Sequence, residues 1–200
     1  KLGIPVQIFR EVVLPGTVIG DLASAIASDC DITPIPVVAP ACHDTGSAVA
    51  AVPAEGTGFA WISSGTWSIM GVEASEPVVT TESLAYGMTN EGGVNHTIRL
   101  SKNIMGLWPV QECKRTWARH GQDFSYDELT QMAAAASPLR SVIDVDHNDF
   151  LKPGDMPMRI QQFCQVHLQT VPQTPGEIIR CALEGVALKY RDTLESLERL

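Results

Sequence analysis

Two pairs of strand-like segments, each joined by a short glycine-containing turn, limit the folds open to this chain more than any other feature. Residues 58–63 and 67–73 flank a Ser-Gly-Thr turn, and residues 87–91 and 96–100 flank a turn that begins with Gly-Gly. Short turns join antiparallel neighbours, so each pair predicts a β-hairpin. Beyond residue 102, the apolar residues recur at spacings typical of helices. Hairpins combined with helices predict an α/β domain.

The other elements are predicted from caps, prolines and apolar runs. The Ser125-x-x-Glu128 pattern is a capping box, and Pro175 suits the first turn of a helix. Prolines and glycines placed singly through residues 1–36 are typical of a connector. The expected helices are 22–27, 47–52, 103–119, 125–136, 156–171 and 175–200. Further strands are expected at 36–42, as a buried strand, and at 142–145.

Composition excludes several classes of function. The formal net charge is −9, whereas a nucleic-acid-binding surface needs clustered Lys and Arg. The five cysteines form no C-x-x-C pair, which favours a reducing cytoplasm over disulfides or a zinc ribbon. The histidines lack metal-ligand spacing, so no metal site is predicted. Apolar runs fall short of the roughly 20 residues that span a bilayer, so we expect no membrane segment.

Both ends of the sequence predict a piece of a longer protein. The first residue is Lys1 rather than methionine. The helical pattern of residues 177–200 continues to the last residue without a glycine or proline stop signal.

A carboxylate stands at a predicted strand-to-helix turn, in His43-Asp44-Thr45-Gly46. There Asp44 could accept a proton from a substrate hydroxyl, as a general base does. Such aspartates are more often helix caps, and Asp44 or Thr45 occupies the expected cap position. Asp-Thr-Gly is also the triplet of the aspartic proteases, but the largely helical sequence downstream disfavours their all-β fold.

Small and polar residues could bind phosphate and nucleotide farther along the chain. The Ser64–Thr66 turn allows close approach, because Gly65 has no Cβ and Thr66 carries a hydroxyl. It is not a Walker A loop, and a hairpin turn needs a glycine in any case. Asn103 and Gln111 lie about two turns apart in one expected helix, where they could face a nucleotide or solvent. By itself, Asn90–Gly93 is typical of a plain turn.

Four co-linear segments together resemble the FGGY carbohydrate kinases, and within them the rhamnulokinases. The segments are Cys42–Ala50 (CHDTGSAVA), Trp61–Gly71 (WISSGTWSIMG), Thr89–Val94 (TNEGGV) and Lys102–Trp108 (KNIMGLW). The opening residues 3–5 and 13–20 are similar to the stretch that precedes the domain junction in this family. The resemblance therefore covers nearly the whole chain.

The resemblance implies an actin-like ATPase (ribonuclease H-like) α/β fold, of which this chain holds only part. Residues 1–36 would end the N-terminal domain and connect it to a partial C-terminal domain, residues 37–200. The implied reaction transfers the γ-phosphoryl group of ATP, with Mg²⁺, to a sugar hydroxyl, which in rhamnulokinases is the 1-hydroxyl of L-rhamnulose. The roles carried over by position are Asp44 as the catalytic base, His43 and Thr45 beside it at the sugar, Gly65 and Thr66 at the ATP phosphates, and Asn103 and Gln111 at the nucleotide.

The resemblance also implies a partner, the N-terminal kinase domain, which carries a phosphate-binding hairpin, an acidic residue for Mg²⁺ and most sugar contacts. We therefore expect these 200 residues to be inactive alone. Two alternatives stay open. One is a non-catalytic module that binds nucleotide or sugar on the same fold, and the other is a kinase for another sugar such as L-fuculose.

Overall fold

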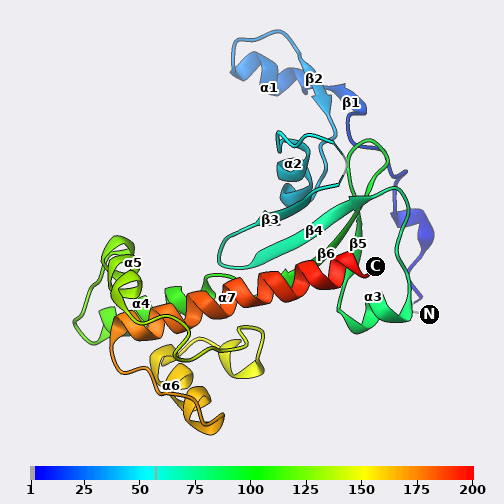
Figure 1. Cartoon of the computed structure of the whole chain (residues 1–200). Helices are drawn as coiled ribbons and strands as arrows, with labels where there is room; N and C mark the ends of the chain where they lie inside the picture. The colour runs from blue at the N-terminus through cyan, green and yellow to red at the C-terminus, as the bar shows by residue number, and fades with distance from the viewer. Residues whose placement is uncertain (1–2, 57) are drawn as a thin grey trace.

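A four-stranded antiparallel sheet forms the centre of the protein in the computed structural model, which describes residues 3–56 and 58–200 (Figure 1). The strand order is β3-β4-β6-β5. The strands are β3 (Ala60–Ser63), β4 (Ser68–Ala74), β5 (Thr89–Gly92) and β6 (Ile98–Ile104). Both predicted hairpins are confirmed, since β3 pairs with β4 and β5 pairs with β6, each antiparallel.

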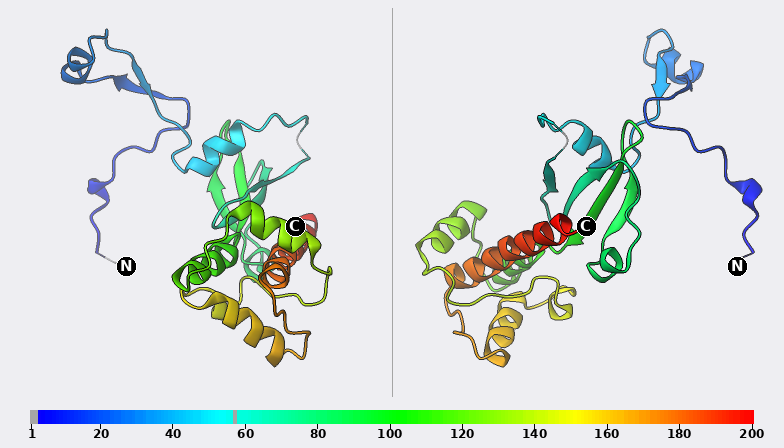
Figure 2. Two further views of the ribbon diagram at one scale, coloured as in Figure 1. Left: turned by 90° about the vertical axis from the view of Figure 1, so that its left-hand side faces the viewer. Right: turned by 45° about the vertical axis from the view of Figure 1, so that its right-hand side comes forward.

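Helices cover one face of the sheet and extend beyond its edge (Figures 1 and 2). After the short helix α3 (Thr81–Ala85), the longer ones are α4 (Trp108–Arg119), α5 (Tyr126–Ala135), α6 (Met156–Val166) and α7 (Pro175–Glu198). Capping boxes begin α5 at Ser125 and α7 at Thr174. In each, the side chain of the cap residue accepts a hydrogen bond from a backbone N–H of the first turn, and a glutamate side chain accepts one from the backbone N–H of the cap residue. The capping box expected at Ser125 is therefore confirmed.

The two faces of the sheet pack against different helices. Successive side chains of a strand point to opposite faces, so Arg99 of β6 lies on the face opposite to Leu100 and Ile104. The Arg99 guanidinium contacts α2 (Asp44–Ala50), since a Cβ added at Gly46 would lie 3.2 Å from its Cζ. On the other face, the hydroxyl of Ser68 hydrogen-bonds that of Tyr190 in α7 at 2.6 Å.

The hydrophobic core lies between this second face and the helices. Its buried residues run from Met70 to Leu197, and Ile104, Phe150 and Ile160 among them are fully buried. By contrast, residues 3–35 project away from the sheet (Figures 1 and 2). They form η1 (Val6–Ile8), β1 (Val18–Asp21) and α1 (Ser24–Asp29), and β1 pairs with β2 (Pro36–Val38).

Two expected strands differ from the structure. Residues 36–42 form only the three-residue β2, and Val38 is exposed because the two-stranded β1-β2 sheet has no second layer above it. The domain division that we place at 36/37 falls inside β2 and stays a prediction. Residues 142–145 form no strand: Ile143 and Val145 are buried, but the backbone N–H and C=O of Val142 bond the Gln169 side chain instead of a ladder.

Two expected helices have different limits. The helix expected from residue 103 begins at Trp108, because β6 continues through Ile104 in register with Ser68 of β4. Helix α6 ends at Val166 rather than residue 171, and Leu168 just beyond it adopts the left-handed conformation with φ of 54°.

Candidate functional site

Helix α2 presents Asp44 to solvent. The helix begins at Asp44, and His43 occupies the N-cap, so the expectation that Asp44 or Thr45 is the cap is wrong. The Asp44 side chain is 97% exposed, and its Oδ1 accepts a hydrogen bond from the Thr45 N–H at 2.7 Å. Thr45 itself is buried. The carboxylate is thus oriented by the backbone while it remains open to a substrate hydroxyl.

His43 joins Asp44 to the sheet through a chain of polar contacts. His43 Nδ1 lies 2.9 Å from Glu91 Oε2, and His43 Nε2 lies 3.6 Å from Asp44 Oδ1. The Arg99 guanidinium donates to the same Glu91 oxygen at 2.7 Å and to the Gly92 carbonyl at 3.3 Å. Arg99 is 2% exposed, so this ion pair is anchored in the protein interior at one end and reaches the surface at Glu91.

The Ser64–Thr66 bend is fixed against the start of α4. The Gly65 and Thr66 carbonyl oxygens accept hydrogen bonds from the N–H groups of Leu107 and Trp108 at 2.9 and 3.1 Å. Thr66 Oγ1 donates to Gln111 Oε1 at 3.0 Å. The structure therefore brings Gly65, Thr66 and Gln111 together.

Close packing beneath the bend depends on a glycine. A Cβ added at Gly106 would lie 2.6 Å from the Gly65 carbonyl oxygen, which is closer than real Cβ contacts allow. Only glycine lets the segment that leads into α4 approach the bend so closely.

Asn103 lies in β6 opposite Ile69, not on the helix that carries Gln111. The interpretation that Asn103 and Gln111 share a helix face is therefore wrong. Asn103 is exposed and, four residues after Arg99 in the same strand, lies on the α2 face of the sheet. This position places it on the same side of the sheet as Asp44.

A cavity of about 350 Å³ lies next to Gln111, between α4, α5 and α7. Its lining is mostly apolar and includes Val110, Leu129, Ile179 and Leu183. An apolar recess with a few polar groups at its edge is typical of small-ligand sites.

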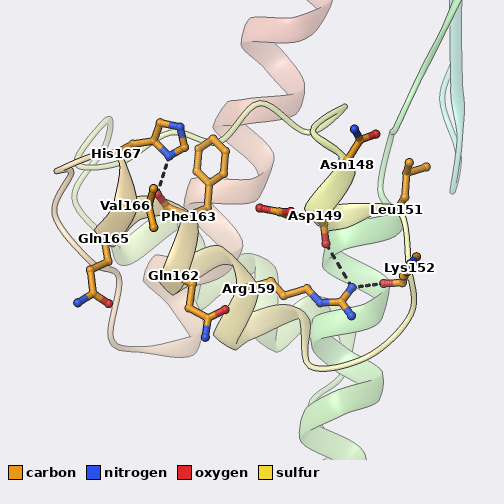
Figure 3. A pocket seen from close by; sticks show the side chains of 10 residues that line it. All are labelled: Asn148, Asp149, Leu151, Lys152, Arg159, Gln162, Phe163, Gln165, Val166 and His167. Carbon is orange, nitrogen blue, oxygen red and sulfur yellow. Dashed lines mark hydrogen bonds between the residues drawn. The ribbon is translucent and has the colours of Figure 1, made fainter.

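A larger hollow of about 780 Å³ lies between η2 (Asn148–Phe150) and α6 (Figure 3), away from every predicted site residue. The guanidinium of Arg159 in this hollow is already bonded to the carbonyl oxygens of Asp149, Lys152 and Pro153. Much of the hydrogen-bonding capacity of this guanidinium is therefore used within the protein, so we do not select this hollow as the candidate site.

Within residues 3–56 and 58–200, no group of three or more His, Cys, Asp or Glu side chains is arranged to hold a metal ion. Across the same residues, no helix has the length and hydropathy needed to cross a membrane. All five cysteines are free thiols.

Sequence reasoning missed Glu91 and Arg99 as members of the site. It treated Asn90–Gly93 as a turn and Arg99 only as a strand residue. The signal that could have found them is the hairpin register, which sets Glu91 directly opposite Arg99. Opposite charges at facing positions of a predicted hairpin indicate a cross-strand pair.

Comparisons with known proteins agree with these features. Residues 60–200 match the model of the FGGY family of carbohydrate kinases, C-terminal domain. The chain is 46% identical over 199 residues to a rhamnulokinase of Bacteroides thetaiotaomicron and 41% identical over 200 residues to one of Enterococcus faecalis. Both alignments include 100% of this chain but only 40% of the relative, so the chain spans about two fifths of the length of these relatives.

A solved structure shows the same fold. The xylulose kinase of Rhodospirillum rubrum superimposes with a TM-score of 0.66 at 16% identity, covering 98% of this chain and 38% of that one. The predicted α/β, actin-like fold class is confirmed, as is the partial coverage of that fold. On the match of its family model and the identity to its relatives, the chain belongs to the FGGY family of carbohydrate kinases.

Proposed function

We propose that the full-length protein containing this chain phosphorylates L-rhamnulose at its 1-hydroxyl with ATP. The observation that carries the proposal is the exposed Asp44 carboxylate, 97% accessible at the start of α2, in a chain 46% identical to a rhamnulokinase. The alternative of a non-catalytic module is less favoured, because the relatives that match the chain over its whole length are named as rhamnulokinases.

In the proposed reaction, Asp44 accepts the proton of the sugar hydroxyl while the hydroxyl oxygen attacks the γ-phosphorus. The bond between that phosphorus and the β–γ bridging oxygen breaks, and ADP leaves. Phosphoryl transfer needs positioning and charge stabilisation more than covalent help, so one oriented carboxylate is a sufficient protein base.

The nucleotide would be bound on the α4 side. Thr66 and the Gly65 backbone would contact the phosphates, and Asn103 would lie between them and Asp44 on the same face of the sheet. The apolar cavity beside Gln111 suits a heteroaromatic base. Mg²⁺ would arrive as the ATP complex, because this ion prefers substrate phosphates and water to an all-protein cage. We also propose a cytoplasmic location, which suits a chain of free thiols.

The test is Asp44→Asn in the full-length protein. The substitution keeps the shape of the side chain but removes the base, so kcat should fall by roughly 10²–10⁴-fold. Turnover would be followed by coupling ADP release to NADH oxidation, and ATP affinity by calorimetry should change little. Near-normal turnover of the variant would refute the role of Asp44. Comparison of kcat/KM for L-rhamnulose and L-fuculose decides between the two sugars.

We further propose that these 200 residues alone turn over no sugar. Among the described residues, no element shields the Asp44 carboxylate from solvent, whereas phosphoryl transfer needs a site that excludes water. The same coupled assay, applied to the chain by itself, would contradict this if ADP release depended on L-rhamnulose.

A further inference from the structure

Arg99 is buried in β6, and its charge is compensated by one carboxylate. The side chain is 2% exposed, and its Nη2 donates to Glu91 Oε2 at 2.7 Å. A buried guanidinium without its partner is strongly unfavourable, so Glu91 is held firmly in this position. Glu91 itself is 39% exposed, so the carboxylate that Arg99 fixes from below also reaches the surface beside α2.

The oxygen that Arg99 holds is the one that meets His43. Glu91 Oε2 lies 2.9 Å from His43 Nδ1. An ionised carboxylate only accepts hydrogen bonds, so Nδ1 must carry a proton. In a neutral imidazole the other nitrogen, Nε2, is then a bare acceptor. The Glu91 contact therefore selects one tautomer of His43.

The bare nitrogen lies beside the proposed base. His43 Nε2 is 3.6 Å from Asp44 Oδ1, too far for a hydrogen bond between them. Both atoms accept hydrogen bonds, and both belong to side chains with substantial exposure. Two neighbouring acceptors of this kind match a ligand that offers adjacent hydroxyl groups, as a sugar does.

The same guanidinium also touches the helix that carries Asp44. A Cβ added at Gly46 would lie 3.2 Å from Arg99 Cζ and 3.0 Å from the Ala41 Cβ. The absent side chain at Gly46 is what lets α2 rest against the guanidinium. Arg99 thus sets the position of both site residues, Asp44 through α2 and His43 through Glu91.

From this geometry we infer that Glu91, fixed by Arg99, is a positioning residue that holds His43 in the Nδ1–H tautomer. In that tautomer, His43 Nε2 accepts a hydrogen bond from a sugar hydroxyl next to the one that Asp44 deprotonates. The inference rests on the proposed function, because it assigns the sugar to this face.

The experiment compares Glu91→Ala with Glu91→Gln in the full-length protein, with Glu76→Ala in the exposed β4–α3 loop as the control. Glu91→Ala should lower kcat/KM for the sugar by about 10- to 100-fold, because a misplaced positioning group loses this much, and leave KM for ATP within about twofold. Glu91→Gln should recover most of the loss, since its amide oxygen can accept from both Arg99 and His43. Glu76→Ala should match the wild type.

A second readout is the His43 tautomer, measured from ¹⁵N chemical shifts of histidine-labelled protein with His43→Asn for assignment. The wild type and Glu91→Gln should show a protonated Nδ1 and a bare Nε2, whereas Glu91→Ala should show a mixture. A wild-type His43 protonated on Nε2, alone or together with Nδ1, would overturn the inference, even if Glu91→Ala fails to fold. So would a Glu91→Ala enzyme with unchanged sugar kcat/KM.

Different results contradict the proposed function and the proposed role of Glu91. A wild-type protein without turnover of L-rhamnulose or L-fuculose contradicts the proposed function. The tautomers of the wild type and Glu91→Gln still report whether Glu91 orients His43.

Discussion

The two sides of the proposed site are held by different forces. On the Asp44 side, α2 is seven residues long and packs on β3 with Val49 buried, and its first turn meets the Arg99 guanidinium at Gly46. On the Thr66 side, the bend is bonded to the start of α4, whose residues Val110, Cys113 and Trp117 belong to the hydrophobic core. Polar contacts at the first turn of α2 therefore help to position Asp44, whereas core packing positions the Ser64–Thr66 bend.

This difference indicates how each side should respond to change. Hydrophobic burial is non-directional and shared among many residues, so its loss lowers global stability. An ion-pair network is directional and depends on each member, so its loss displaces particular atoms. Substitutions in the hydrophobic core beneath the Ser64–Thr66 bend should therefore appear mainly in stability, and those in the polar contacts on the Asp44 side mainly in catalysis.

The largest expected effect is on stability, from Ile104→Ala in β6. Ile104 is fully buried in the core, and a truncation of this kind destabilises by about 2–5 kcal/mol. Ile19→Ala is the matched control, because Ile19 is also a strand isoleucine but is 59% exposed in β1. Thermal unfolding should separate the two variants widely. Equal shifts in Tm would show that the outer strands matter as much as the core.

The next effect is on nucleotide use, from Thr66→Ala in the full-length protein. The substitution removes the hydroxyl donor that bonds Gln111 in this structure and that would turn to a phosphate oxygen when ATP binds, so kcat/KM for ATP should fall by the equivalent of roughly 0.5–3 kcal/mol. Thr66→Ser keeps the hydroxyl and should retain most activity. If both variants lost activity equally, the threonine methyl rather than the hydroxyl would be the important group.

A smaller effect is expected from Gly46→Ala. The added Cβ would lie 3.0 Å from Ala41 Cβ and push against Arg99, but alanine favours a helix over glycine by about 1 kcal/mol. Overpacking costs about 1–3 kcal/mol against this gain, so the free energy of unfolding should fall by no more than about 2 kcal/mol. Sugar kcat/KM should nevertheless fall, because α2 and the guanidinium move apart. A variant with lower Tm and normal kinetics would contradict the division between the two sides.

The smallest effect is the pH dependence of the α7 cap. Hydrogen bonds from the N–H groups of Thr174 and Gln173 lower the pKa of Glu177 below its ordinary value of 4.5. Stability from this cap is fully present above pH 4.5 and is lost as pH falls through the lowered pKa. The difference in Tm between wild type and Glu177→Gln should therefore shrink in acid. A constant difference from pH 7 to 3 would exclude this role.

Local chemistry made part of this structure predictable. The two hairpins follow from alternation and turn residues, and the cap at Ser125 follows from a four-residue pattern. The long-range pairing that extends β6 through Asn103 has no local signal, because Asn103 also suits a helix start. Likewise, the His43–Glu91 contact joins residues 48 positions apart and depends on the docking of α2, which no single window of the sequence encodes.

Helix α7 has a consequence that reaches across the molecule. Its 24 residues extend over about 36 Å. In its first half Arg180 donates a hydrogen bond to the Ala133 carbonyl of α5, and in its second half Tyr190 is hydrogen-bonded to Ser68, next to the Ser64–Thr66 bend. Because one continuous helix carries both bonds, we expect a shift of α5 along the axis of α7 to strain the Tyr190–Ser68 bond. We therefore expect alterations at the α5–α7 contact to reach the Ser64–Thr66 bend as well as the cavity that lies between these helices.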